Sequence, residues 1–189
     1  MGRGVGSETV GSERIMDSEP TLSQNDPFAL LGLDARFDVD EALVEKRWLG
    51  LVAGIHPDLA GGDAGAAQSL ARLNEARDVV ADPLRRAEAL LRLMGDGGVG
   101  SNDALPEGFL MQMLEVREEA EAAASAGDAQ RVAELHAWAC KQREEMLGSI
   151  GELFGKLEQA PDALAREEVG KRINALRYIE RMIAQVGGE

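Results

Sequence analysis

Apolar residues recur at steps of three and four along most of the chain, a period typical of helices that bury one face. The pattern predicts four helices before residue 95. After residue 105 it contains no strand signal and predicts three long helices, near 106–126, 128–158 and 162–186, separated by turn residues at 127–128 and 160–162. We therefore expect an all-α chain with two helical units.

Capping residues mark the first two helices. Asp26-Pro27 opens the segment PFALLGL. Asp38 is expected to cap the second helix, with Glu41 completing a capping box. Pro57 is expected to end that helix, because the residue before a proline is pushed out of helical geometry. The apolar positions of the second helix are Val44, Trp48, Leu51, Val52 and Ile55.

The third and fourth helices follow a Gly-rich loop. QSLARLNEARDVV forms the third helix, and Asp82-Pro83 begins the fourth, PLRRAEALLRLM, which Gly95 ends. The positions in helical register on the third helix are Leu70, Leu73, Ala76, Arg77 and Val80.

Segments without a helical period divide the chain. Residues 1–25 are rich in Gly, Ser and Glu and poor in large apolar side chains, so we expect a disordered tail that is neither a secretory signal nor a mitochondrial presequence. The sequence leaves open whether Met1 or Met16 is the native start. Residues 96–104 have the composition of a linker, so the predicted units are 26–95 and 105–187.

Charge and cysteine content exclude several classes of partner and site. The 189 residues carry 34 Asp and Glu against 20 Lys and Arg, a net charge of −14. Such a field repels phosphate backbones and anionic lipid, so we expect neither a nucleic acid nor a membrane as partner. No apolar run approaches the roughly 20 residues that cross a bilayer. The single cysteine excludes an internal disulfide and a multi-cysteine zinc site.

The sequence contains no motif for bond chemistry. A phosphate-binding P-loop, a dinucleotide fingerprint and a Gly-x-Ser-x-Gly elbow are all missing. His136 and Cys140 stand one helical turn apart and would suit a two-ligand metal face, but the pattern supplies no third ligand. Ordinary packing is the favoured interpretation of this pair. We expect no catalytic residue, no metal and no cofactor.

The tripeptide His56-Pro57-Asp58 lies between the second and third helices. A rigid solvated turn would account for these residues taken alone. Their context is more specific, because DPFALLGL and an amphipathic helix precede them and LNEARDVVADPLRRA follows. This order resembles a J-domain, the module with which DnaJ-type co-chaperones stimulate the ATPase of DnaK-class chaperones. The resemblance implies that the tripeptide is the stimulating loop.

Further segments extend the resemblance over nearly the whole chain after residue 25. DPFALLGLDARFDVD, DPLRRAEALLRLMG, FLMQMLEVREE and INALRYIERM occur in this order and together resemble the HscB-type J-domain co-chaperones of bacterial iron–sulfur cluster assembly. PLRRAEALL and FLMxxLExREE are far more specific than the tripeptide. The resemblance implies a cytoplasmic protein whose J-domain, 26–95, binds an HscA/DnaK-class chaperone. It also implies a three-helix bundle, 105–187, that binds an IscU-type scaffold.

The basic residues near the tripeptide depart from the pattern of J-domains. Those domains usually carry several Lys or Arg on the helix before the tripeptide, and here Lys46 and Arg47 remain as the expected chaperone-docking residues. A solvated helix face is the alternative interpretation of this pair. Ala53-Gly54-Ile55 precede the tripeptide, and Leu59 follows it. Docking is therefore expected to be weaker, or to shift to the arginines Arg72, Arg77, Arg85 and Arg86.

The outer helices of the bundle each have a core stripe. On the first helix the stripe is Phe109, Met113, Val116, Ala120 and Ala123. On the last helix it is Ala165, Val169, Arg172, Leu176, Ile179 and Ile183. Several large side chains point away from these stripes, and apolar groups beside carboxylates on a surface suggest a partner site. A misjudged helix rotation, or packing against the first unit, is the alternative explanation.

The same off-core positions emerge from the resemblance. The scaffold-binding positions of HscB-type co-chaperones map by motif onto Leu110, Met111, Leu114, Glu115, Glu118 and Tyr178. We therefore expect a two-partner adaptor and not an enzyme. One alternative is a J-domain co-chaperone with another client. Another is a helical metal-binding protein or small-molecule enzyme that uses His56, Asp58 and His136.

Overall fold

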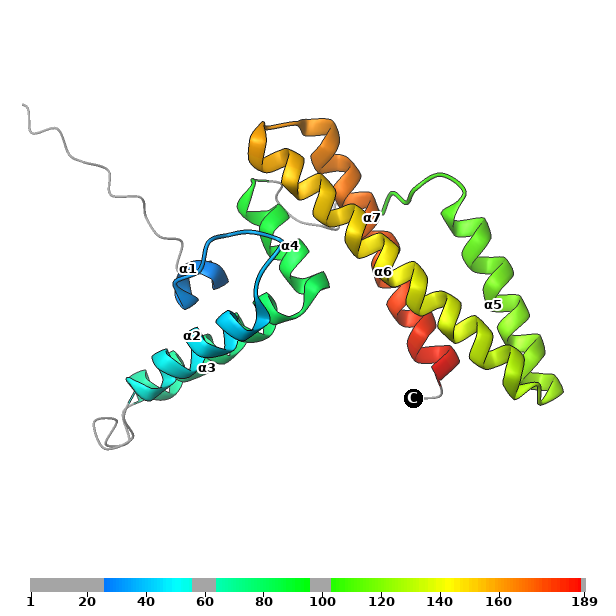
Figure 1. Cartoon of the computed structure of the whole chain (residues 1–189), viewed down its shortest axis with the longest axis horizontal. Coiled ribbons are helices and arrows are strands. Elements are labelled where there is room, and N and C mark those ends of the chain that lie inside the picture. The colour runs from blue at the N-terminus through cyan, green and yellow to red at the C-terminus, as the bar shows by residue number, and fades with distance from the viewer. Residues whose placement is uncertain (1–25, 56–63, 96–102, 188–189) are drawn as a thin grey trace, which may run out of the picture.

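The computed structural model describes residues 26–55, 64–95 and 103–187, and every regular element in these ranges is a helix (Figure 1). The predicted all-α fold is thus confirmed for the described residues. The predicted tail, the His56-Pro57-Asp58 tripeptide and most of the predicted linker lie outside them. The helices are α1 (Pro27–Leu31), α2 (Glu41–Ala53), α3 (Ala64–Ala81), α4 (Pro83–Leu93), α5 (Phe109–Ala126), α6 (Ala129–Gln159) and α7 (Ala163–Gly187).

Aspartate side chains cap the first turns of several helices. Asp26 caps α1 and Asp82 caps α4, as expected. The prediction for α2 was wrong: Asp40, not Asp38, accepts the backbone N–H of Ala42 at 2.9 Å. Asp40 has the extended backbone typical of an N-cap residue, and Val39, just before it, packs against the core. The helical period alone could not choose between two aspartates that precede the same amphipathic run.

The end of α2 also differs from the expectation. The helix stops at Ala53, and the backbone N–H of Gly54 bonds to the carbonyl of Leu51 at 3.2 Å. The helix therefore ends three residues before His56. Pro57 lies outside the described residues, so its expected part in ending the helix stays a prediction. Leu51 and Leu70, which fit the helical spacing of α2 and α3, are 40% and 36% exposed. The buried contact between α2 and α3 therefore includes fewer residues than fit the helical spacing.

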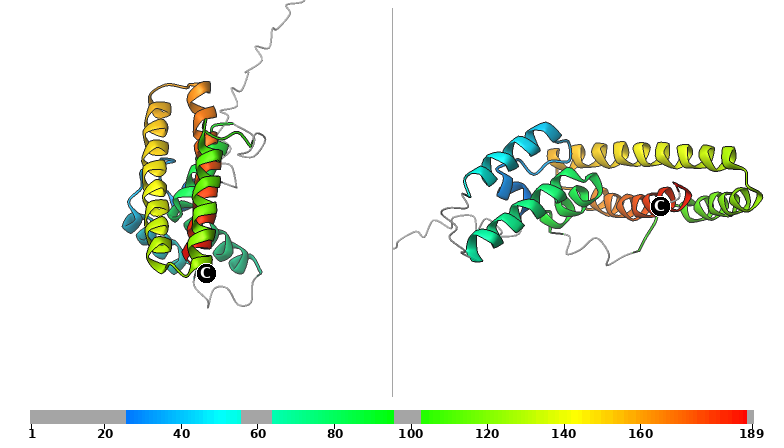
Figure 2. Two further views of the ribbon diagram at one scale, coloured as in Figure 1. Left: turned by 90° about the vertical axis from the view of Figure 1, so that its right-hand side faces the viewer. Right: turned by 90° about the horizontal axis from the view of Figure 1, so that it is seen from below.

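The helices form an elongated molecule with α2 and α3 side by side at one end and α5 at the other (Figures 1 and 2). The long helices α6 and α7 pack against each other along most of their length and connect the two ends. One end of this pair meets α4, and the other end carries α5. No described helix is long and apolar enough to cross a membrane.

The larger hydrophobic core belongs to both halves of the chain. It combines buried residues of α1–α4, such as Phe28, Val44 and Leu91, with buried residues of the long pair: Ile150, Phe154, Leu157, Val169, Ile173 and Leu176. Phe37, from the segment between α1 and α2, stacks on Phe154 of α6 at a centroid distance of 5.4 Å. Gly151 permits this approach, since a Cβ there would stand 3.3 Å from the Phe37 ring. The J-domain-like half is therefore built onto α6 and α7.

Polar contacts cross the same boundary. Arg166 of α7 donates to the carbonyl of Met94 at 3.2 Å. Asn174 of α7 donates to the carbonyl of Ala104 at 3.0 Å, which attaches the segment before α5. Arg177 of α7 forms an ion pair with Glu88 of α4. These contacts and the shared core hold the two helical units in one arrangement.

A smaller core attaches α5 to the long pair. It contains Phe109 and Met113 of α5, Ala139 of α6, and Ala175, Ile179 and Met182 of α7. Most stripe positions of α5 and α7 are buried as expected. Arg172 is an exception, because its guanidinium bonds to the Glu168 carboxylate at 2.6 Å. The buried face of α7 is wider than one stripe because α7 packs against α4, α5 and α6.

Candidate functional site

The first candidate site is the α2–α3 pair, whose helices flank the His56-Pro57-Asp58 tripeptide in the sequence. The tripeptide itself lies outside the described residues, so its stimulating role stays a prediction. The described parts of α2 and α3 pack side by side (Figure 1). This packing positions the chain up to Ile55 on one side of the tripeptide and from Ala64 onward on the other.

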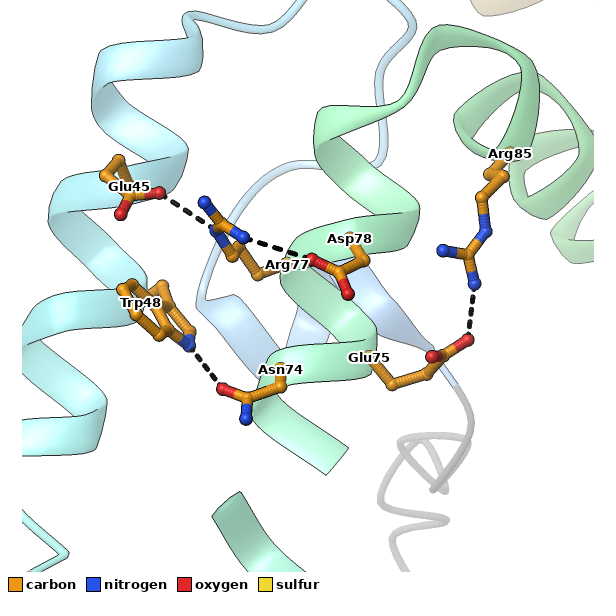
Figure 3. Close-up of polar contacts among 7 residues, drawn as sticks. All are labelled: Glu45, Trp48, Asn74, Glu75, Arg77, Asp78 and Arg85. Atoms are coloured by element: carbon orange, nitrogen blue, oxygen red, sulfur yellow. Dashed lines mark hydrogen bonds and ion pairs between the residues drawn. The ribbon is translucent and has the colours of Figure 1, made fainter. Parts of the chain in front are cut away.

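A polar cluster connects α2 to α3 (Figure 3). The Arg77 guanidinium donates to Glu45 at 2.9 Å and lies over the Trp48 ring, 5.0 Å from its centroid. The Trp48 indole N–H donates to the Asn74 amide oxygen at 3.0 Å. The hydrogen bond to the Glu45 carboxylate raises the pKa of Arg77. Arg77 is therefore occupied in holding the hairpin together.

Lys46 and Arg47 are the basic residues that the sequence analysis proposed for docking to the chaperone. Lys46 and Arg47 are both exposed, and within the described part of the chain neither forms an ion pair. Arg85 is paired with Glu75 at 2.6 Å (Figure 3). The docking role for Lys46 and Arg47 stays a prediction, but their side chains are accessible.

The expectation that Arg86 could serve in docking was wrong. Its side chain is buried, donates to the carbonyl of Val80 at 2.8 Å, and lies over the Phe37 ring at 5.3 Å. Burial lowers the pKa of Arg86, and the carboxylates of Glu41, Asp82 and Asp38 act in the opposite direction. The residue braces the segment before α2 and is not available for docking.

The second candidate site is the set Leu110, Met111, Leu114, Glu115, Glu118 and Tyr178, here called the bundle face. Its apolar members are 48%, 64%, 44% and 40% exposed, in that order. The expectation that these large side chains lie off the core therefore agrees with the structure. The alternative explanation was that these side chains pack against the first helical unit, but no such contact buries them. Their binding role stays a prediction.

The bundle face is held by its buried neighbours. Phe109 meets the Tyr178 ring edge-on, at a centroid distance of 6.3 Å. Arg181 covers the same ring at 4.5 Å. Leu110, Leu114 and Tyr178 line one hollow of 170 Å³ between α5 and α7. The structure thus brings together residues more than 60 positions apart in the sequence, whereas Met111, Glu115 and Glu118 stand outside the hollow.

Sequence reasoning missed part of the hollow. Arg117, Arg181 and Gln185 also line it. Arg181 stands three positions after Tyr178, on the same side of α7, so helical spacing from the tyrosine was a usable signal. Arg117 lies three positions after Leu114 in the same way.

Of the residues in the metal-binding alternative, His56 and Asp58 lie outside the described ranges, and only His136 is described, together with Cys140 on the same helix. The Sγ of Cys140 lies 3.9 Å from Nδ1 of His136, a contact consistent with packing on one helix. Among the described residues, no group of three His, Cys, Asp or Glu side chains is placed to hold a metal ion.

Comparisons with known proteins agree with this architecture. A family model described as "HSCB C-terminal oligomerisation domain" matches residues 105–187. A co-chaperone protein HscB homologue of Burkholderia thailandensis is 36% identical over 168 residues, which cover 86% of this chain and 92% of the relative. The corresponding protein of an Azoarcus species is 33% identical over 165 residues, 84% of this chain and 90% of the relative.

Solved structures show the same fold. The chaperone HscB from Vibrio cholerae matches with a TM-score of 0.69 and 27% identity, over 86% of this chain and 95% of that one. The human co-chaperone HscB matches with a TM-score of 0.71 over 89% of this chain and 82% of that one, at 20% identity. Both the J-domain and the C-terminal helical domain expected from the sequence are therefore part of this fold. On the identity and coverage of its bacterial relatives, the chain belongs to the HscB family of co-chaperones.

Proposed function

We propose that this chain is a co-chaperone of iron–sulfur cluster assembly that binds an IscU-type scaffold and presents it to an HscA/DnaK-class chaperone in the bacterial cytoplasm. The observation that carries the proposal is the bundle face. Leu110, Leu114 and Tyr178 are exposed around one hollow in a chain of the HscB family.

The bundle face has the chemistry of a protein-binding surface. Leu110, Leu114 and the Tyr178 ring offer apolar area in a small region, and a few central anchors of this kind usually dominate an interface. Glu115 and Glu118 stand on the exposed side of α5, where they offer acceptors to a basic group of the partner. A rim of charge around apolar anchors favours one orientation of the bound scaffold.

The second part of the proposed function, stimulation of the chaperone ATPase, is assigned to the α2–α3 hairpin. The resemblance assigns His56, Pro57 and Asp58 to the contact that stimulates the chaperone ATPase. The chain performs no bond chemistry in this scheme; it favours the hydrolysis-competent state of its partner by binding that state better. Lys46 and Arg47, exposed on α2, supply positive charge for the encounter.

The test is a triple variant of the bundle face, Leu110→Ala, Met111→Ala and Leu114→Ala. These side chains are 44% to 64% exposed, so the thermal midpoint is expected to change little. Affinity for an IscU-type scaffold, measured by calorimetry, is expected to fall at least about 100-fold, because central anchors cost about 2 kcal/mol or more each. Stimulation of the chaperone ATPase without scaffold is expected to stay unchanged.

Leu164→Ala is the matched control. Leu164 is 76% exposed at the start of α7 and lies outside the bundle face, so both measurements are expected to match the wild-type chain. Wild-type affinity in the triple variant would show that the scaffold does not bind at the bundle face. A large fall in the thermal midpoint would show that the three residues support the core, since a buried Leu→Ala change costs about 2–5 kcal/mol.

A further inference from the structure

The hollow at the bundle face is the first part of a longer groove between α5 and α7. A second hollow of 230 Å³ shares Arg117, Met182 and Gln185 with the first one. A third, of 520 Å³, shares Ala124, Val132 and Val186 with the second. The three hollows therefore follow one another along the seam, from Tyr178 to the turn that joins α5 to α6.

Small side chains keep this groove open. Ala120 and Ala124 of α5 line it, and their side chains are shorter than those of Leu110 and Leu114, about two to four turns earlier on the same helix. Met182, Val132 and Val186 supply an apolar floor. From Leu110 to Ala124 the helix advances about 21 Å at 1.5 Å per residue, the length of six or seven residues of extended chain at about 3.3 Å each.

Arginines stand at the end of the groove that meets the bundle face. Arg181 lies on the Tyr178 ring and donates to the carbonyl of Arg177 at 3.2 Å. Among the described residues it has no carboxylate partner, although the chain carries a net charge of −14. Arg117 pairs with Glu121 of its own helix, with both side chains more than 60% exposed. A carboxylate entering the groove would meet both guanidinium groups.

We propose that the α5–α7 groove binds an extended segment of the scaffold, in which a carboxylate pairs with Arg181 and apolar side chains follow toward Ala124. The proposal rests on the proposed function and lengthens its interface beyond the bundle face. Arg181 becomes a specificity residue, held over Tyr178 before the partner arrives, so that less side-chain freedom is lost on binding.

Size and charge favour this occupant over others. The first two hollows, of 170 and 230 Å³, are each of a size for one or two side chains, and the third, of 520 Å³, is wider. A second copy of this chain would bring another charge of −14 against the first. The carboxylate of an extended segment fits only the end of the groove that holds Arg117 and Arg181, because Glu121 and Asp128 line the other two hollows. Small apolar groups fit beside Ala120, Ala124 and Val186.

The decisive variant is Ala124→Trp, which fills the groove about 21 Å from Leu110 and leaves the bundle face intact. Ala124 is exposed, so the fold is expected to tolerate the ring, and thermal unfolding checks this. Ala137→Trp on α6, exposed and outside the three hollows, is the matched control. We expect Ala124→Trp to weaken scaffold affinity about 10-fold and Ala137→Trp to leave it unchanged.

Charge is tested separately with Arg181→Glu and Arg181→Lys. Reversal is expected to weaken scaffold affinity at least about 10-fold at low salt. The lysine keeps the charge but loses the planar stack on Tyr178, so its loss of affinity is expected to be smaller than that of the reversal. A photo-crosslinker at position 124 is expected to capture the scaffold. Crosslinks only between copies of this chain would overturn the assignment.

The two proposals fail in different ways. If Leu110→Ala weakens the scaffold complex while Ala124→Trp and Arg181→Glu bind like the wild-type chain, the groove is not part of the interface and the bundle face stands. If the wild-type chain shows no affinity for the scaffold, the proposed function fails, and the groove assignment fails with it.

Discussion

Arg177 of α7 donates two N–H groups, at 2.9 and 2.6 Å, to one carboxylate oxygen of Glu88 in α4. The two residues are 89 positions apart and belong to the two helical units. Arg177 also immediately precedes Tyr178 of the bundle face. This ion pair therefore connects the J-domain to the residue next to the proposed scaffold contact.

A double-mutant cycle with Glu88→Gln and Arg177→Met is expected to give a coupling energy of about 1 kcal/mol, because the side chains are partly shielded, at 21% and 34% exposure. Urea unfolding of the four proteins measures this energy. The exposed Arg117–Glu121 pair, one turn apart on α5, is the control and is expected to give at most about 0.5 kcal/mol. Equal coupling energies for the two pairs would mean that the position of Glu88–Arg177 between the units adds no stability.

His56→Gln separates the two proposed activities. Stimulation of the chaperone ATPase is expected to be lost, while scaffold affinity stays at the wild-type value, because the bundle face lies on α5 and α7. Steady-state ATP hydrolysis and scaffold calorimetry measure the two effects. Loss of scaffold affinity in a variant with wild-type thermal stability would show that the two sites are not independent.

The exposed pair Lys46 and Arg47 is expected to act through long-range charge. Replacing both with alanine should raise the protein concentration needed for half-maximal ATPase stimulation, with a larger effect at low salt than at 0.15 M, where screening acts within about 8 Å. The maximal rate should remain close to wild type. A salt-independent defect would indicate a short-range contact, and no defect would support the solvated-face interpretation.

Helical period predicted the parts of the fold that depend on one helix at a time. Phe109 and Met113 are buried and Leu110 and Leu114 are exposed, as a single turn of α5 dictates. The period fits both Asp38 and Asp40 as caps of α2 and could not choose between them; in the structure Asp40 is the cap, and Val39, between the two, packs against the core.

Arginine residues were the hardest to place from the sequence. Arg86 and Arg85 are neighbours in the sequence, yet one is buried under Phe37 and the other pairs with Glu75 at the surface. Arg172 fits a core stripe by spacing but reaches Glu168. A long side chain with a charged end suits several environments, so its placement depends on contacts from other helices.

The core shared by α1–α4 and the long pair determines when the J-domain can be finished during synthesis. Leu91 leaves the ribosome about eighty residues ahead of Val169 and Ile173, which lie in the same core, a delay of about 4–16 s at ~5–20 residues per second. During that time the part of this core that faces α6 and α7, including Leu91, has no cover. The nascent N-terminal half is therefore itself a candidate for the chaperones that bind exposed apolar segments, until its own last helix arrives.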